Sequence, residues 1–196
     1  MKILIDNGHG ENTPGKCSPD AALYEWSWTR EIARCVVNSL RKQGYDAELL
    51  VREDSDVSLR ERVKRVNAIC AEEGSSNVLC VSIHCNAAGR DGRWHNASGW
   101  SVYVGKNASV ASKTLARTLY DIADSLDMQG NRSVPKGRYW VQDLAICRDT
   151  MCPAVLTENM FMDSREDVKF LLSREGKQKC VDVHVDGIIR YLEVKS

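Results

Sequence analysis

Four side chains in this sequence are suited to metal-assisted chemistry: His9, Glu25, His84 and Glu158. Two imidazoles and one carboxylate are a sufficient ligand set for a catalytic zinc ion, because they leave its fourth position open for water. A second carboxylate that is not a ligand can then carry the proton that such a site has to move. The residue types therefore predict a zinc site with a proton carrier beside it.

Both histidines are predicted where a strand ends. Residues 3–6 form a short apolar strand, and the glycines on either side of His9 let the backbone turn sharply after it. Residues 78–83 are a β-rich apolar run, typical of a buried central strand, that ends at His84. Open α/β sheets place their sites at the carboxyl ends of strands, so both imidazoles are expected there.

The two glutamates are predicted at comparable positions. Residues 24–42 carry apolar side chains at every fourth position, which indicates an amphipathic helix with Glu25 in its first turn. Residues 154–157 read as a short strand that ends at Glu158. The four candidate residues are thus expected at strand ends and a helix start.

The remaining elements define the expected architecture. Further strands are predicted over 46–52 and 100–104 with a short one within 139–147, and helices after the capping residue Ser58 and over 109–126, 164–172 and 175–192. Strands that alternate with helices predict an α/β fold with a mostly parallel or mixed central sheet and helices on both faces. A length of 196 residues fits a single domain.

The candidate residues lie in four recognisable motifs, at residues 5–10 (IDNGHG), 23–25 (LYE), 82–87 (SIHCNA) and 155–158 (VLTE). In this order they resemble the zinc-dependent N-acetylmuramoyl-L-alanine amidases of the amidase-3 type, which cut peptidoglycan. The resemblance runs along nearly the whole chain. It implies zinc ligands at His9, Glu25 and His84 and a catalytic acid/base at Glu158.

The resemblance also implies a substrate. In that family the bond cut joins the lactyl group of N-acetylmuramic acid to the first L-alanine of the stem peptide, and residues 1–196 would form the catalytic domain. Two departures from the family pattern bear on the shape of the substrate groove. Asn7 stands where Pro or Ala is more usual, and Asn159-Met160-Phe161 replaces the common Thr-Gly-Phe.

Two other functions are open at this stage. A zinc peptidase of carboxypeptidase type would use a zinc ion in the same way, on a peptide bond. Such an enzyme should carry an arginine pocket for a terminal carboxylate, and no motif marks one. A non-catalytic peptidoglycan-binding module would be expected to lack at least one of the four residues. Individually, each histidine also has a structural alternative, and each glutamate is also a common helix-terminal or turn residue.

Charge and hydropathy constrain the partners. The 27 basic and 27 acidic residues balance, so no overall basic field favours a nucleic-acid partner. No apolar run approaches the roughly 20 residues that cross a bilayer, and no signal peptide precedes the strand at 3–6. We therefore expect a monomer that stays in the cytoplasm until release, as a phage or prophage endolysin does, or a secreted enzyme if Met1 is not the native start.

The eight cysteines form no C-x-x-C pair, which favours reduced, buried side chains over a disulfide framework. Cys85 is not expected to act as a nucleophile with His84, because adjacent residues on a strand point to opposite faces. His95 is expected in solvent, and His184 is expected to form hydrogen bonds within a helix. Asn86 either orients substrate or stabilises a turn. The aromatic side chains near His84 either stack on sugar rings or pack in the interior: Trp94, Trp100 and Tyr103.

Overall fold

Six strands form one mixed sheet in the computed structural model, which describes residues 1–195. The strands are β1 (Lys2–Asn7), β2 (Asp46–Leu49), β3 (Val78–Asn86), β4 (Ser101–Val104), β5 (Trp140–Val141) and β6 (Ala154–Phe161). Their order in the sheet is β2-β1-β3-β6-β4-β5. The first four are parallel, whereas β4 runs antiparallel to β6 and β5 runs parallel to β4.

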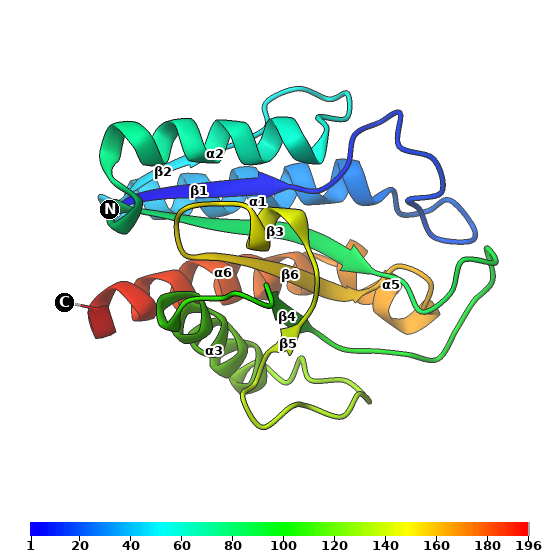
Figure 1. Cartoon of the computed structure of the whole chain (residues 1–196). Helices are drawn as coiled ribbons and strands as arrows, with labels where there is room; N and C mark the ends of the chain where they lie inside the picture. Colours follow the sequence, from blue (N-terminus) through cyan, green and yellow to red (C-terminus); the bar gives the residue numbers. More distant parts are fainter. Residues whose placement is uncertain (196) are drawn as a thin grey trace.

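Helices cover both faces of this sheet (Figure 1). They are α1 (Glu25–Lys42), α2 (Leu59–Glu73), α3 (Val110–Ser125), α4 (Ala145–Arg148), α5 (Arg165–Leu172) and α6 (Arg174–Lys195), with a 3-10 turn at Ser75–Asn77. One hydrophobic cluster lies between the sheet and α1, α3, α5 and α6, and a smaller one lies on the side of α2 and α4. The predicted fold class is confirmed.

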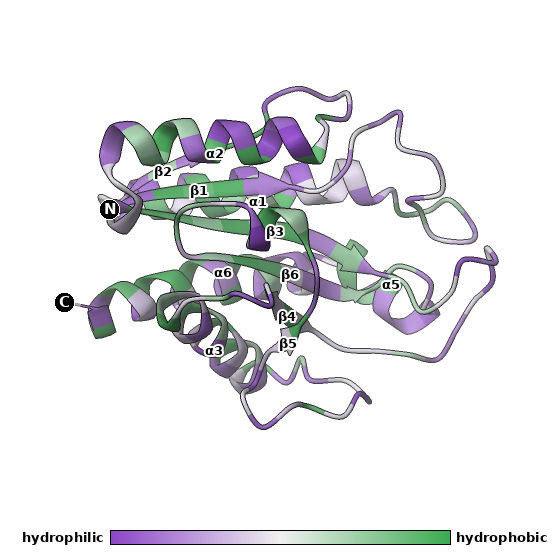
Figure 2. Cartoon of the chain, viewed as in Figure 1, coloured by the Kyte–Doolittle hydropathy of each residue, from purple (hydrophilic) through white to green (hydrophobic). Residues whose placement is uncertain are grey.

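The alternation of side chains along β1 explains the two layers. Ile3 and Ile5 belong to the larger cluster, whereas Leu4 belongs to the smaller one. The central strands are accordingly apolar on both faces along most of their length (Figure 2). The arrowheads of β1, β3 and β6 all point to one end of the molecule, where the long loops gather (Figure 1).

Two strands extend further than their apolar runs predict. His84 lies inside β3, and Glu158 lies in the middle of β6, where the two residues face each other in register. The backbone ladder continues because main-chain hydrogen bonding does not depend on the apolar character of the side chains. Both polar residues are therefore held by a sheet rather than by a loop.

The start of α2 and the region after residue 139 also test the predicted elements. Ser58 caps α2 as expected, since its side chain accepts a hydrogen bond from the backbone N–H of Glu61 at 3.3 Å. The predicted strand over 46–52 is shorter in the structure and ends at Leu49. The segment 139–147 holds the two-residue β5 and most of the four-residue α4.

His184 is a fully buried histidine of α6 with both ring nitrogens in hydrogen-bond contact. Its Nδ1 lies 2.6 Å from the carbonyl oxygen of Cys180, and its Nε2 lies 2.8 Å from Oγ1 of Thr157. The prediction of a hydrogen-bonded helix histidine is confirmed. Burial lowers the pKa of His184 from 6.5 to about 4, so the ring is neutral in the folded protein.

This depressed pKa makes the stability of the protein depend on pH. In the unfolded chain His184 takes up a proton below about pH 6.5, whereas in the folded chain it does so only near pH 4. The contribution of neutral His184 to the free energy of unfolding is therefore complete above pH 6.5 and is lost as the pH falls. Between pH 7 and pH 5 we expect His184 to cost the wild type about 2 kcal/mol of unfolding free energy. Urea unfolding at both pH values should show that His184→Gln loses less stability by that amount. An equal loss in both proteins would contradict the expectation.

Six of the eight cysteines are buried, while Cys17 is partly buried and Cys35 is exposed. This distribution fits small apolar side chains, and their reduced state remains a prediction that thiol counting under denaturing conditions checks. Among residues 1–195, no helix has the combination of length and apolar character that crossing a bilayer requires.

Candidate metal centre and catalytic groove

Gly8 and Gly10, on either side of His9, are needed because other groups approach their backbone too closely to leave room for a side chain. A Cβ atom at Gly8 would lie 2.3 Å from Cε1 of His84, and one at Gly10 would lie 2.0 Å from the backbone nitrogen of Asp56. Between them His9 adopts a φ of 59°, in the left-handed region that non-glycine residues rarely occupy. The Gly-His-Gly motif thus combines two tight contacts with one strained backbone position.

Two buried arginines hold this strained position. The carbonyl oxygen of His9 accepts hydrogen bonds from Nη1 of Arg30 at 3.0 Å and from Nη2 of Arg62 at 3.2 Å. Arg62 also pairs with the buried carboxylate of Asp6 at 2.5 Å and donates to the carbonyl oxygen of Asn7 at 2.6 Å. The end of β1 is therefore fixed by main-chain contacts to arginines of α1 and α2.

Loss of Arg62 is expected to destabilise the protein by about 3–5 kcal/mol, because Arg62→Met leaves the charge of Asp6 buried without its partner. Arg65→Met is the matched control, one turn further along α2. Arg65 pairs with Glu53, and both side chains are partly exposed, so its loss should cost about 1 kcal/mol or less. Urea unfolding of both variants provides the comparison. Similar costs for the two would contradict a special role of the buried pair.

The structure brings His9, Glu25 and His84 together in one cluster. Nε2 of His9 lies 3.4 Å from Oε2 of Glu25, and Nδ1 of His84 lies 3.1 Å from Oε1. The imidazole rings are nearly perpendicular, with centroids 5.0 Å apart. One donor atom from each residue lies within 4.8 Å of the others, so the three predicted ligands can reach a common metal ion.

Glu25 provides the test of whether this cluster fits a metal. Its Oε1 accepts a hydrogen bond from the backbone N–H of Cys85 at 3.0 Å, which orients the carboxylate. Its Oε2 is buried and has no hydrogen-bond partner among residues 1–195. A buried carboxylate oxygen without a partner is costly, and a cation held between it and the imidazoles would satisfy it.

The protonation states of His9 and Glu25 suit metal binding, whereas a metal ion would have to displace the proton of His84. Burial alone would lower the pKa of His84, but the hydrogen bond to Glu25 and the charge of Glu25 raise it. Burial lowers the pKa of His9 to about 4, which leaves its imidazole neutral. Burial would raise the pKa of Glu25, but the hydrogen bond from His84 and the charges of both histidines outweigh it and lower that pKa. A neutral imidazole and an ionised carboxylate are the forms that bind metal ions.

Glu158 lies beside this cluster rather than in it. It faces His84 across the β3–β6 pair and lines a groove of about 390 Å³ together with His9, His84 and Lys16. Its Oε2 is shielded from solvent and has no hydrogen-bond partner among residues 1–195. Burial, together with the charge of Glu25, raises the pKa of Glu158 to about 7, which suits a group that takes up and releases a proton near neutral pH.

Asn7 and Asn159, which belong to the two departures from the family pattern, lie outside the lining of this groove. Asn7 and Asn159 are both fully buried, and neither lines the groove. Asn159 follows Glu158 on β6 and so points to the opposite face, where it donates to the carbonyl oxygen of His84 at 2.9 Å. It also accepts from Nε1 of Trp100 at 2.8 Å. Strand alternation turns the side chains of Asn7 and Asn159 into the core, so neither of these two residues lines the groove directly.

Burial decides the alternatives that the sequence left open for two of the aromatic residues. Trp100 is 1% exposed and Tyr103 is 8% exposed, so both pack in the interior rather than against sugar rings. Trp94 is half-buried beneath the guanidinium of Arg165, which lies 4.5 Å from its ring centroid. Oδ1 of Asn86 accepts from the backbone N–H of Ala87 at 2.9 Å, as expected of a turn residue.

Cys85 and His95 behave as the sequence predicts. The side chain of Cys85 packs in the larger hydrophobic cluster, on the opposite face from His84, and burial raises its pKa well above the ordinary value. It is therefore no candidate nucleophile. His95 remains partly exposed and contacts Asp91 at 3.0 Å, outside the metal cluster.

The arginines near the site were not predicted from the sequence. Arg30 and Arg62 lie in amphipathic helices, where a charged residue is normally read as part of a solvated face. Only the tertiary structure shows that both are buried. The sequence offers one indication that Arg62 lies near the site, which is its position in the first turn of a capped helix close to the expected strand ends.

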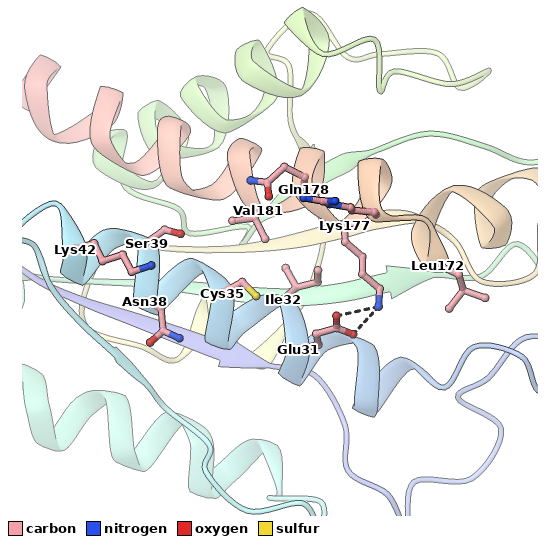
Figure 3. Close-up of a pocket in the computed structure, with 11 residues that line it drawn as sticks. Glu31, Ile32, Cys35, Asn38, Ser39, Lys42, Leu172, Lys177, Gln178 and Val181 are labelled. Atoms are coloured by element: carbon pink, nitrogen blue, oxygen red, sulfur yellow. Dashed lines mark hydrogen bonds and ion pairs between the residues drawn. The ribbon is translucent and has the colours of Figure 1, made fainter.

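A second hollow of about 570 Å³ lies between α1 and α6 (Figure 3). The ion pair of Lys177 with Glu31 spans it, and Cys35 and Val181 contribute to its walls (Figure 3). None of the four candidate residues lines it. Three of them, His9, His84 and Glu158, instead line the groove at the end of the sheet.

Comparison with known proteins places this fold and site in a family. Residues 3–190 match the N-acetylmuramoyl-L-alanine amidase family, and the chain belongs to that family. It is accordingly a peptidoglycan hydrolase, an amidase that cleaves the bond between N-acetylmuramic acid and L-alanine. The enzyme class predicted from the sequence is confirmed.

Individual relatives support this assignment. The endolysin of Bacillus phage SPP1 is 29% identical over 201 residues, which cover 99% of this chain and 67% of the phage protein. The sporulation-specific N-acetylmuramoyl-L-alanine amidase of Bacillus subtilis (strain 168) is 26% identical over 201 residues, 100% of this chain and 70% of that protein. The crystal structure of N-acetylmuramoyl-L-alanine amidase from Clostridium difficile 630 has a TM-score of 0.82 at 26% identity and covers 100% of this chain and 98% of that chain.

Proposed function

We propose that this amidase binds one zinc ion through His9, Glu25 and His84, and that Glu158 carries the proton during hydrolysis. The observation that supports the proposal most directly is the buried Oε2 of Glu25, which has no hydrogen-bond partner and lies 3.4 Å from Nε2 of His9. Imidazole nitrogens and carboxylate oxygens are the ligands of catalytic zinc sites, in which three protein groups leave one position open.

The residues around the site support a hydrolytic mechanism. A zinc ion held there would polarise the scissile carbonyl group and lower the pKa of water. Glu158, with a pKa of about 7, takes a proton from the attacking water and donates it to the departing nitrogen of L-alanine. Protonation is necessary because an amine leaves far more readily than its anion. Arg30 and Arg62 keep His9 in position through its carbonyl oxygen.

The proposal extends to the organisation of the enzyme. Residues 1–196 act as one catalytic domain, in monomeric form, on peptidoglycan of the cell wall. The family match over residues 3–190 and the single six-stranded sheet support one catalytic unit. The endolysin of phage SPP1 among the relatives is compatible with a role in lysis.

The two alternative functions make different demands. A non-catalytic binding module has no need of a carboxylate with a pKa of about 7 beside three clustered donors, which this chain has. A carboxypeptidase-type enzyme cuts next to a free terminal carboxylate and leaves the sugar–peptide bond intact. The products of digestion therefore separate an amidase from a peptidase.

Digestion of purified sacculi is expected to release intact stem peptides with a new N-terminal alanine, without attached sugar and without new reducing ends. The reason is that hydrolysis of the lactyl amide frees the amino group of L-alanine and leaves every glycosidic bond intact. Mass analysis of the soluble products and an assay of reducing sugars provide the measurement. Shortened stems that still carry their sugars would instead support the peptidase.

A further inference from the structure

Arg132 is a cation beside the catalytic groove that lacks a carboxylate partner. Its guanidinium packs over the ring of Trp140, 4.8 Å from the centroid, and 5.6 Å from that of Phe161. Nη1 donates to Oγ of Ser101 at 3.0 Å and to the hydroxyl oxygen of Tyr103 at 3.2 Å. These contacts hold the guanidinium plane in one orientation.

Three of the five N–H donors of Arg132 have no partner among residues 1–195. Within residues 1–195 both of its hydrogen bonds come from Nη1, and it forms no ion pair there. Nε and Nη2 retain three N–H donors in the fork arrangement that matches a carboxylate. Asp6 and Asp56, the aspartates of the neighbouring groove, already pair with Arg62.

The sheet register places Arg132 next to Glu158. Ser101, which Arg132 contacts, lies directly opposite Glu158 in the antiparallel β4–β6 pair, and His84 lies opposite Glu158 on its other side. Side chains of directly opposite residues share one face and are roughly 5 Å apart. The guanidinium therefore lies on the far side of Glu158 from the metal ligands.

We propose that Arg132 binds the free α-carboxylate of the second residue of the stem peptide. This inference deepens the amidase function and rests on it. The second stem residue of peptidoglycan is a glutamate linked through its γ-carboxyl group, so its α-carboxyl group is either free or amidated. Each peptide residue spans about 3.5 Å, so this carboxylate lies within about two residue lengths of the scissile nitrogen that Glu158 would protonate.

A substrate carboxylate bound to Arg132 would neutralise the charge of its guanidinium and accept hydrogen bonds from its free N–H donors. An amidated stem offers one acceptor oxygen and no charge. The enzyme should thus discriminate between the two forms of the stem.

The test uses the zinc-loaded enzyme and two uncross-linked peptidoglycan preparations that differ only in carrying a carboxylate or a carboxamide at the second stem residue. We expect the wild type to show a kcat/KM about 10- to 100-fold higher on the carboxylate form, mainly through KM. In Arg132→Met this preference should disappear, so that the kcat/KM values on the two forms become equal. Arg132→Lys should restore part of it.

Arg138→Met is the matched control, because Arg138 belongs to the same loop but pairs with Asp121 and Asp124. It should keep the wild-type preference. Equal kcat/KM on both substrates in the wild type, or an unchanged ratio in Arg132→Met, would overturn the proposal. So would a preference that is abolished by Lys16→Met and not by Arg132→Met. Products other than free stems with N-terminal alanine would overturn the amidase function itself, which distinguishes the two failures.

Discussion

Glu158→Gln is expected to lower kcat by about 10²- to 10⁴-fold while the protein keeps its bound metal, because general acid–base catalysis contributes on that scale. Glutamine has nearly the same size but cannot accept and release a proton. The neutral carboxamide also fits a position where burial already raises the pKa of Glu158 to about 7. Rates on peptidoglycan and metal content per chain should be measured on the same preparations.

The control for this variant is Glu175→Gln, which removes an exposed glutamate at the start of α6. It should leave both kcat and metal content unchanged. If Glu158→Gln released the metal and kept the rate per bound ion, Glu158 would be a ligand and the proposed roles would have to be exchanged. If it kept both the metal and the rate, another group would have to carry the proton.

Removal of the metal is expected to abolish activity, with a decrease of about 10³-fold or more, since a Lewis acid contributes several kcal/mol to such a reaction. Elemental analysis of the purified enzyme should find one zinc ion per chain. A chelator should remove zinc and activity together, and added zinc should restore both. Metal-free protein that still cuts peptidoglycan would exclude the proposed mechanism.

The ligand set is tested by His84→Ala against His95→Ala. His84 contacts Glu25 at 3.1 Å within the metal cluster, whereas His95 lies outside it. Loss of His84 should weaken zinc affinity by more than the roughly 10- to 100-fold typical of outer-shell partners. His95→Ala should retain wild-type zinc affinity. Equal effects of the two substitutions would argue against the cluster as the metal site.

The residues of the site were accessible from the sequence because each lies next to a strong local signal. Glycines bracket His9, an apolar strand leads to His84 and another leads to Glu158, while Glu25 begins an amphipathic helix. Local sequence patterns report such features directly, since they follow from backbone freedom and from side-chain periodicity. Their order along the chain also matched a known family.

Strand ends were less accessible. The apolar run of β3 stops before His84, yet the strand continues to Asn86 because its partner β6 continues beside it. Hydrophobicity marks where a strand is buried, whereas its length depends on pairing with residues far away in the sequence. For the same reason the sequence could not show that Asn159 faces away from the groove.

The sequence by itself was sufficient to predict the α/β class and to select His9, Glu25, His84 and Glu158 as the candidate site residues. Only the tertiary structure shows which charged residues contact or surround these site residues. Arg62 and Arg132 look like surface cations in the sequence, but one is buried against Asp6 and the other stacks on Trp140 beside the groove. Burial of a charge depends on partners brought together from distant segments, and local propensity carries no information about those partners.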